Sequence, residues 1–328
     1  MKIDLNKKEF QIKKNHHYVW RCYLDRWAVK GNGLYYISES GKISQAHAKR
    51  LCCEKEFYKV HALTKEDIFF IETFSKKSPE SLQRIHMKFL GNFIKVSNGL
   101  HALEKVGADS PEYKHLYQLL ACNSLEDTHG LFESGVLPVL NELWCENIAI
   151  LEDTGNMISF CAFIGHQITR SKSFKDVALS NFVLGDSHFR GISDYRTLFE
   201  RNWWFLSFIF GINLGDSFYH DTTSKHIFIK NNTAIPFITS DNPAINVHPS
   251  LATLAENKAP VSMDLFYPLS PELAYMINES DQYDRLEYSI SEEDVIKFNT
   301  MMATKADRTM FSNCEKTLKS IHKYMRNH

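Results

Sequence analysis

A chain of 328 residues is long enough to bury a sizeable core, and its length allows one large domain or two modest ones. Its 38 lysines and arginines face 39 aspartates and glutamates, which gives a net charge of −1. This balance excludes the strong overall basicity typical of nucleic-acid-binding domains and leaves open only a local basic face. With 44% hydrophobic and 23% charged residues, the composition is that of an ordinary soluble globular protein.

Neither an export signal nor a membrane span is predicted. The opening segment, MKIDLNKKEFQIKKN, is charged where an export signal has its apolar stretch. The longest apolar run, from Trp203 to Gly215, is shorter than the roughly 20 residues that a membrane span needs. The seven cysteines form no C-x-x-C pair and are typical of thiols that pack as small apolar groups in a reducing compartment. We therefore expect a cytoplasmic protein without a membrane partner.

Strands are predicted first, and helices follow. In LYYISESGKISQAHAK, aromatic and β-branched residues flank the turn Glu39-Ser40-Gly41, which indicates a β-hairpin. A helix is then predicted from Thr64, because Asp67 stands three positions later and the apolar residues recur at helical spacing as far as Ser78-Pro79. The helical period continues to about residue 215 and includes the apolar runs 157–168 and 203–212.

Short β-rich runs return after the helical block. HIFIKN, AIPFITSD, SMDLFYPLS and LAYMINES are each β-branched or aromatic and are bounded by turn residues, so each predicts a strand. A last helix is predicted from Ser291, where Asp294 completes an S-x-x-D cap and acidic residues occupy the first turn.

These elements predict an α+β fold: an antiparallel sheet formed from N-terminal and C-terminal segments, with a large central helical block. No repeat, low-complexity tract or Pro/Gly-rich linker interrupts the chain, so we expect a single unit over residues 1–328. Its parts are an N-terminal hairpin segment (1–62), the helical block (63–215), a β-rich segment (226–290) and a C-terminal helix (291–325).

The opening stretch KKNHHYVWRCYLDRWA is the first candidate site. On a helix, His17, Arg21 and Asp25 would share one face, and a histidine beside a carboxylate and an arginine suits a general base or a phosphate clamp. The alternative is an amphipathic segment whose aromatic residues pack inside while its polar groups pair at the surface.

Two further stretches carry polar residues at unusual places. In FITSDNPAINV, a strand ends at Ser240-Asp241-Asn242, a corner that could aim a carboxylate into a cleft or could be only a capped turn. In FIGHQITRS, the polar residues His166, Gln167 and Arg170 lie within an apolar helical run, where burial costs free energy unless polar groups are paired. These residues could bind a carboxylate or phosphate, or could be satisfied core residues.

The chain resembles the DUF4238 family, a bacterial group without an established function. The resemblance rests on five blocks in family order: His17, Tyr18, Val19, Tyr23, Leu24, Arg26 and Trp27 near the start, then Glu54–Tyr58, Phe163–Arg170, Ser240–Pro243 and Pro268–Pro271. It implies that polar residues from distant segments belong to one recurring pattern and converge in a site. It implies no reaction.

Two hypotheses for the function lead, and a third, an enzyme that acts on a small metabolite, stays open beside them. The first is a nuclease-type or other phosphodiester- or nucleotide-acting effector of phage defence or a toxin system. It would use His17, Glu54 and Asp241 in catalysis, Arg26, Gln167, Arg170, Ser240 and Asn242 in substrate binding, and Mg²⁺ held by Asp241 and Glu54. The second is a non-catalytic ligand- or partner-binding regulatory protein.

Several common enzyme motifs are absent from the sequence. No P-loop, G-x-G-x-x-G or G-x-S-x-G motif occurs, which argues against a P-loop NTPase, a Rossmann dehydrogenase and an α/β-hydrolase. No zinc-binding spacing occurs either, which argues against a structural metal.

Overall fold

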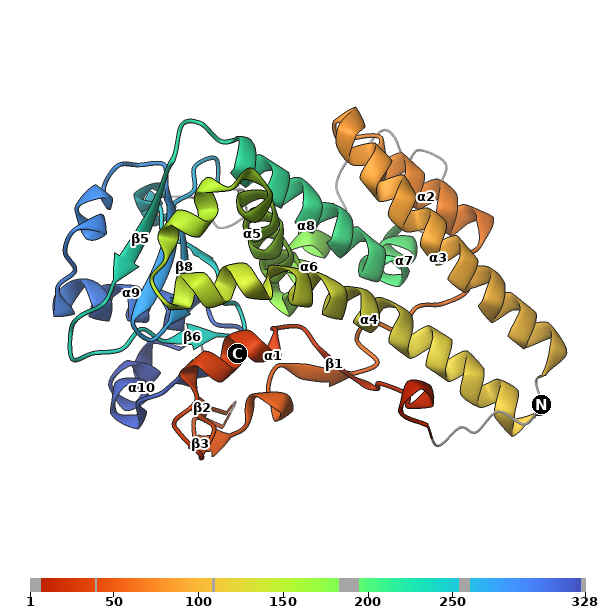
Figure 1. Ribbon diagram of the computed structural model, residues 1–328, viewed down its shortest axis with the longest axis horizontal. Helices are drawn as coiled ribbons and strands as arrows, with labels where there is room; N and C mark the ends of the chain where they lie inside the picture. The colour runs from red at the N-terminus through yellow and green to blue at the C-terminus, as the bar shows by residue number, and fades with distance from the viewer. Residues whose placement is uncertain (1–6, 39, 108–109, 183–194, 254–259, 326–328) are drawn as a thin grey trace.

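A computed structural model describes residues 7–38, 40–107, 110–182, 195–253 and 260–325. In Figure 1 the strands gather at one end of the molecule, and two long helices extend toward the other end. Strands from both ends of the chain meet at the β-rich end. The fold is therefore α+β with a large central helical block, as the sequence predicted.

The central block is helical throughout its described part. Its helices are α2 (Lys65–Ser75), α3 (Glu80–Val106), α4 (Pro111–Trp144), α5 (Thr154–Thr169), α6 (Lys172–Phe182), α7 (Tyr195–Arg201) and α8 (Trp203–His220). α3 packs against α4, α4 packs against α5, and α5 runs along α8. These four helices enclose the cavity described below.

Within the described residues, the strands form three antiparallel sheets. In the first, the order is β3 (Ile43–Ala46), β2 (Leu34–Ile37), β10 (Met310–Ser312) and β6 (Thr239–Ser240). In the second, it is β5 (Lys225–Lys230), β9 (Leu273–Asn278), β8 (Leu265–Ser270) and β7 (Ile245–Asn246). A third pairs β1 (Asn15–His17) with β4 (Cys53–Lys55). The predicted hairpin is thus β2–β3, and Gly41 has the positive φ of a turn residue, whereas Glu39 lies outside the described residues.

The predicted N- and C-terminal strands share the first sheet, but most of the strands between residues 226 and 280 form the separate second sheet. Every residue of β8 and β9 is buried, so both faces of this sheet must be covered. Tyr275 contacts Phe160 of α5 on one face, while Phe266 stacks on Phe298 of α9 (Glu292–Lys305) on the other. The second sheet is thus a separate layer between α5 and α9.

Both predicted helix starts are confirmed. Thr64 Oγ1 accepts the N–H of Asp67 at 3.1 Å, and the Asp67 carboxylate accepts the N–H of Thr64 at 2.8 Å. Ser291 and Asp294 make the same reciprocal pair at the start of α9. These capping boxes satisfy backbone donors that the helix itself leaves unpaired.

The structure corrects the predicted C-terminal helix, which does not run on through residue 325. α9 ends at Lys305, β10 follows, and α10 (Glu315–Ile321) is a separate helix. The break has a tertiary cause: the carboxylate of Asp241 accepts the backbone N–H groups of the three residues 307–309, and β10 then pairs with β6 and β2. The sequence offers no Gly or Pro at this point that would predict the stop.

The opening stretch also differs from the expected helix. His17 lies in β1, and the helical part, α1 (Arg21–Leu24), begins only four residues later, so His17 does not share a helical face with Arg21 and Asp25. Tyr23 and Trp27 are fully buried and bond the β-rich end: the Tyr23 hydroxyl donates to the Pro268 carbonyl, and Trp27 Nε1 donates to the Phe237 carbonyl. The opening stretch thus joins the N-terminal part of the chain to the β-rich segment after the helical block.

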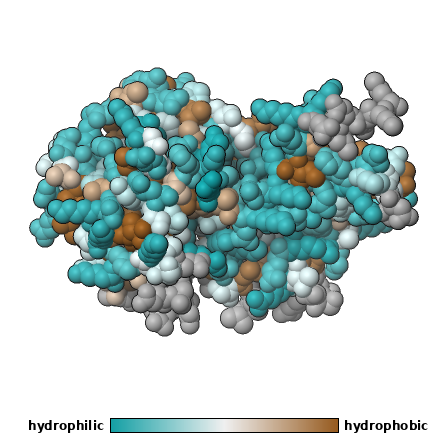
Figure 2. Space-filling model, turned by 90° about the horizontal axis from the view of Figure 1, so that it is seen from below, coloured by the Kyte–Doolittle hydropathy of each residue, from teal (hydrophilic) through white to brown (hydrophobic). Residues whose placement is uncertain are grey.

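The surface seen in Figure 2 is mainly hydrophilic, with hydrophobic residues in small separate groups. Within the described residues, no helix has both the length and the apolar character to cross a membrane.

Candidate functional site

A cavity of about 620 Å³ lies between α3, α4, α5 and α8. Small-molecule sites have volumes of about 300–1,000 Å³, and most of their lining is apolar. Here the apolar part of the wall includes Phe89, Phe132, Val136, Phe163, Phe208 and Ile212. The volume and the lining are those of a site for a small molecule.

Apolar side chains also surround the mouth of this cavity. Ile85 from α3, Leu131 from α4 and Ile158 from α5 line it and are 45%, 74% and 46% exposed. Phe132, which also lines the cavity, is 41% exposed. Single exposed apolar residues are ordinary, but four that line one cavity mark a surface that gains from being covered.

Arg170, which follows the last residue of α5, lies in the polar floor of the cavity and is 3% exposed. Its Nη1 donates to the carboxylate of Glu133 at 2.7 Å, its Nε to the Tyr58 hydroxyl at 3.2 Å, and its Nη2 to the carbonyl oxygen of His17 at 2.7 Å. The guanidinium therefore has a carboxylate partner of opposite charge, and it joins α4, α5 and the N-terminal segment.

Three other floor residues are buried without partners. Both side-chain atoms of Gln167, both ring nitrogens of His166 and Nε2 of His129 make no hydrogen bond with any part of the chain that the structure describes. These residues are 1%, 5% and 3% exposed, and all three line the cavity. A buried polar group without a partner costs about 1–3 kcal/mol, so the floor would gain from a ligand that supplies those hydrogen bonds.

The floor carries no net charge at neutral pH. Burial, followed by the charge of Arg170, lowers the pKa of His166 to about 3. The same two causes, in the same order, hold the pKa of His129 well below its usual value. Both imidazoles are therefore neutral, and the only ion pair among these floor residues is that of Arg170 with Glu133.

The position of His166 depends on a close helix crossing. A Cβ on Gly165 of α5 would lie 2.3 Å from the carbonyl oxygen of Gly211 in α8, which no side chain could tolerate. A Cβ on Gly211 would in turn lie 2.5 Å from Nδ1 of His166. The two glycines let the helices approach and leave room for the imidazole, which packs 5.2 Å from the ring of Phe132 and 5.3 Å from that of Phe208.

Of the residues singled out in the sequence, Arg170, Gln167 and His17 come together. Arg170 and Gln167 line the cavity, and the carbonyl of His17 accepts from Arg170. The His17 imidazole is partly buried, its Nε2 has no partner among the described residues, and burial lowers its pKa. His17 contacts this site through its backbone.

Asp241, Ser240 and Asn242 form a separate corner. Asp241 is 3% exposed, and its oxygens accept from the N–H groups of Asp307, Arg308 and Thr309 at 2.9, 2.8 and 3.1 Å. The Ser240 hydroxyl donates to the carbonyl of Asn242 and accepts its N–H. These contacts are those of a capped turn that holds the segment before β10.

The remaining two candidates lie apart from the cavity lining. Glu54 is half-exposed and forms an ion pair with Lys172. Arg26 is exposed, and its guanidinium lies 4.7 Å from the ring centroid of Trp144. The carboxylates of Glu54 and Asp241 thus have different partners, and no group of three or more His, Cys, Asp or Glu within the described ranges is arranged to hold a metal ion. The residues present do not fit the expected Mg²⁺ site.

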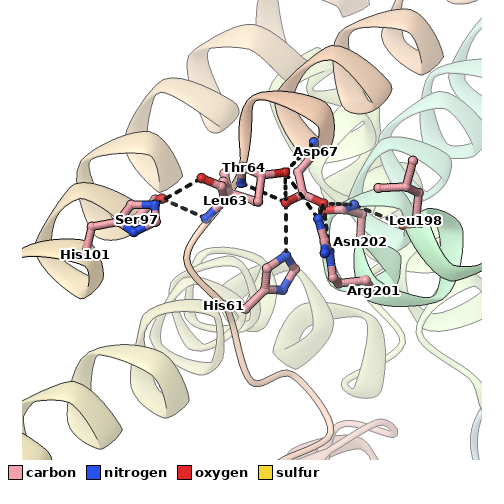
Figure 3. A network of polar contacts seen from close by, with 9 residues as sticks. All are labelled: His61, Leu63, Thr64, Asp67, Ser97, His101, Leu198, Arg201 and Asn202. Carbon is pink, nitrogen blue, oxygen red and sulfur yellow. Dashed lines mark hydrogen bonds and ion pairs between the residues drawn. The ribbon is translucent and has the colours of Figure 1, made fainter. Parts of the chain in front are cut away.

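A second buried polar network, drawn in Figure 3, lies at the start of α2 and joins it to the junction of α7 and α8. Asp67 is fully buried and accepts from Arg201 Nε at 2.9 Å and from Asn202 Nδ2 at 2.8 Å, as well as from Thr64. Burial alone would raise the pKa of Asp67, but nearby His61 and the hydrogen bonds from Arg201 and Asn202 bring it below its ordinary value. The carboxylate is ionised and joins α2 to the start of α8.

Sequence reasoning did not single out His129 and Glu133 as members of this site. A signal was present, because both recur at a spacing of four on one helix, as do His166 and Arg170 on another. Each pair therefore lies along one helical face. The sequence alone does not show that these two helical faces meet in the fold.

Comparison with known families gives one match. A family model described as a protein of unknown function, DUF4238, matches residues 15–105 and 214–316, which is more than half of the chain. No curated protein and no solved structure matched the chain. The matched ranges contain β1, α2, α3 and the Ser240–Pro243 corner, whereas α4 and α5, which supply the polar floor of the cavity, lie between them.

Proposed function

This chain belongs to the DUF4238 family, and we propose that it is a non-catalytic binding protein that takes a small, largely apolar molecule into the cavity between α3, α4, α5 and α8. Occupancy of the cavity would alter how these four helices pack. The ligand would thereby regulate the surface that the helical block presents to a partner.

One observation carries this proposal: among the described residues, Nε2 of His129 and the polar side-chain atoms of His166 and Gln167 have no partner, and all three residues line an apolar cavity. Apolar walls supply binding free energy of about 25 cal/mol for each Å² of apolar surface removed from water. The unpartnered polar atoms would fix the orientation of the ligand, since few and well-placed polar groups give such sites their specificity.

The test uses two glycines of α4. Gly135 lines the cavity and Gly130 does not, and a Cβ at either position meets nothing within 4 Å. Gly135→Phe should therefore fill the cavity without a backbone clash, and Gly130→Phe is the matched control. The probe is N-phenyl-1-naphthylamine, an uncharged apolar dye that fluoresces strongly only out of water.

Saturable, one-to-one dye binding by the wild type and by Gly130→Phe, with loss of binding in Gly135→Phe, is the expected result. Circular dichroism and thermal melting would verify that both variants fold. Equal dye binding by all three proteins, or binding by none, would contradict the proposal.

Phosphodiester hydrolysis stays a separate prediction, with nucleic acid or a nucleotide as its partner. The engaged oxygens of Asp241 and the ion pair of Glu54 give it less support than the cavity gives ligand binding. Its test is expression in a bacterial host of the wild type, His17→Ala and Asp241→Asn, with RNA and DNA integrity followed over time. Breakdown in the wild type that is lost in both folded variants would support a nuclease; intact nucleic acid in all strains would count against it.

A further inference from the structure

We propose that the ligand of this cavity is electrically neutral and ends in an amide-type group, with one hydrogen-bond donor and one acceptor, that pairs with the side chain of Gln167. The inference rests on the proposed function and adds to it the chemical class of the ligand. It follows from the charge, the hydrogen-bonding atoms and the walls of the cavity.

The two buried charges of the floor already neutralise each other. Arg170 is the buried cation, and the carboxylate of Glu133 lies 2.7 Å from its Nη1. A ligand carboxylate placed beside this pair would add a second anion, and an ammonium would add a second cation, each out of water and without a counter-charge of its own. Such burial is strongly unfavourable, so the floor selects against either charge.

Lys88 also lines the cavity, but it is an exposed residue of α3. Its ammonium group stays in water, where it attracts an anion only weakly. Among the described residues that line the cavity, it is the exposed cation through which an anionic ligand could be held at the mouth, and the experiment below includes that outcome.

The atoms of Gln167 define the shape of the polar end. Nε2 is a donor and Oε1 an acceptor, both atoms are buried, and neither has a partner among the described residues. A primary amide, or a cyclic amide whose N–H and C=O lie on the same side, offers the complementary donor and acceptor in one plane, so that two parallel N–H···O bonds form. His166 and His129 each add a neutral ring nitrogen that can donate or accept according to its tautomer.

The apolar walls of the cavity indicate what the rest of the ligand is like. Phe132 and Phe208 flank the imidazole of His166, and Phe163 lines the cavity beside them. Aromatic rings pack well in offset or edge-to-face contact with other rings. A flat, apolar body therefore suits the cavity.

The experiment compares two probes that differ in one group: 1-naphthaleneacetamide and 1-naphthaleneacetate. Each is titrated at neutral pH against N-phenyl-1-naphthylamine bound to the wild type and to Gln167→Met, a substitution of similar size without donor or acceptor. In the wild type the amide should displace the dye at a concentration lower than the acetate by about tenfold or more, the ratio expected for one ionised group left unpaired. In Gln167→Met the amide should displace the dye only at a higher concentration than in the wild type, so the ratio should fall, although the charge of the acetate still opposes its burial beside the Arg170–Glu133 pair.

The outcomes separate the two proposals. Absence of dye binding, or binding that Gly135→Phe does not block, overturns the proposed function. Dye binding that Gly135→Phe blocks, with acetate competing as well as the amide or better, overturns only the neutral-amide inference; loss of the acetate's competition in Lys88→Met would then assign the anion to the mouth. An unchanged amide preference in Gln167→Met overturns the role of Gln167. The wild-type comparison holds even if Gln167→Met does not fold.

Discussion

Nη2 of Arg170 donates a 2.7 Å hydrogen bond to the carbonyl oxygen of His17, which is 153 residues away in the chain. The same guanidinium bonds Tyr58, from the segment that follows β4, and Glu133 of α4. Three segments that the sequence marked as polar therefore meet at one buried cation. Its place at the floor of the cavity means that the fold of the N-terminal segment and the shape of the candidate site depend on one side chain.

Replacement of Arg170 by methionine should destabilise the protein by about 3–5 kcal/mol, because it leaves Glu133 buried without its counter-charge. The free energy of unfolding, measured by urea denaturation, tests this value. Arg196→Met is the control, since Arg196 is 67% exposed in its pair with Glu200 and its loss should cost less than about 1 kcal/mol. Similar losses in both variants would show that the Arg170 contacts contribute little.

Gly211→Ala should destabilise the crossing of α5 and α8 by about 1–3 kcal/mol, because its Cβ would lie 2.5 Å from Nδ1 of His166. Alanine is the better helix former, so the same change at Gly130, where a Cβ meets nothing within 4 Å, should stabilise α4 by about 0.5–1 kcal/mol. Thermal melting of the two variants compares the opposite signs. A gain in stability at both positions would mean that the crossing is looser than described.

Glu126 gives a pH-dependent prediction. Burial raises its pKa to about 7, and its Oε2 has no partner within the described residues. Between the unfolded pKa and the folded pKa, the folded protein holds a proton that the unfolded chain has lost, so stability falls as pH rises through this range. Because Gln cannot titrate, the stability of the wild type relative to Glu126→Gln should fall by about 3 kcal/mol from about pH 4.5 to pH 7. Urea denaturation across this range measures the difference, and a constant difference would contradict the raised pKa.

Asp67 and Asp294 form a matched pair, since each completes a capping box and each bonds an arginine. Asp67 is fully buried, whereas Asp294 is partly exposed. Asp67→Ala should therefore cost about 3 kcal/mol or more, because Arg201 and Asn202 lose a buried partner (Figure 3). Asp294→Ala should cost about 1 kcal/mol, the usual value of a lost cap. Equal losses in chemical denaturation would mean that burial of the Asp67 network adds nothing.

The features that the sequence predicted correctly are local ones. The Thr64–Asp67 and Ser291–Asp294 caps, the helical block and the β2–β3 hairpin each follow from spacing within a few residues. The end of α9 was missed because its cause is distant in the sequence. The carboxylate of Asp241 accepts a backbone N–H group just after α9, and β6 pairs with β10, so the helix stops there. No local breaker marks the place.

The candidate site was predictable only in part, for the same reason. Gln167 and Arg170 stood out as polar residues in an apolar run, and both lie at the cavity floor. His129 and Glu133 belong to a long helix whose polar and apolar residues alternate without a clear stripe, so their inward face could be recognised only against α5. Convergence of two helical faces is a tertiary property, and the spacing of residues within one helix carries little information on it.

The most direct measurement is a crystal structure of the protein grown with saturating 1-naphthaleneacetamide. The predicted result places the naphthalene rings in the cavity between α4, α5 and α8 and the amide within hydrogen-bonding distance of Gln167, about 2.7–3.2 Å. A structure at full saturation in which the compound lies outside the cavity would contradict the binding function inferred for it. A structure in which the compound fills the cavity but Gln167 still has no partner would contradict only the pairing of the amide with Gln167.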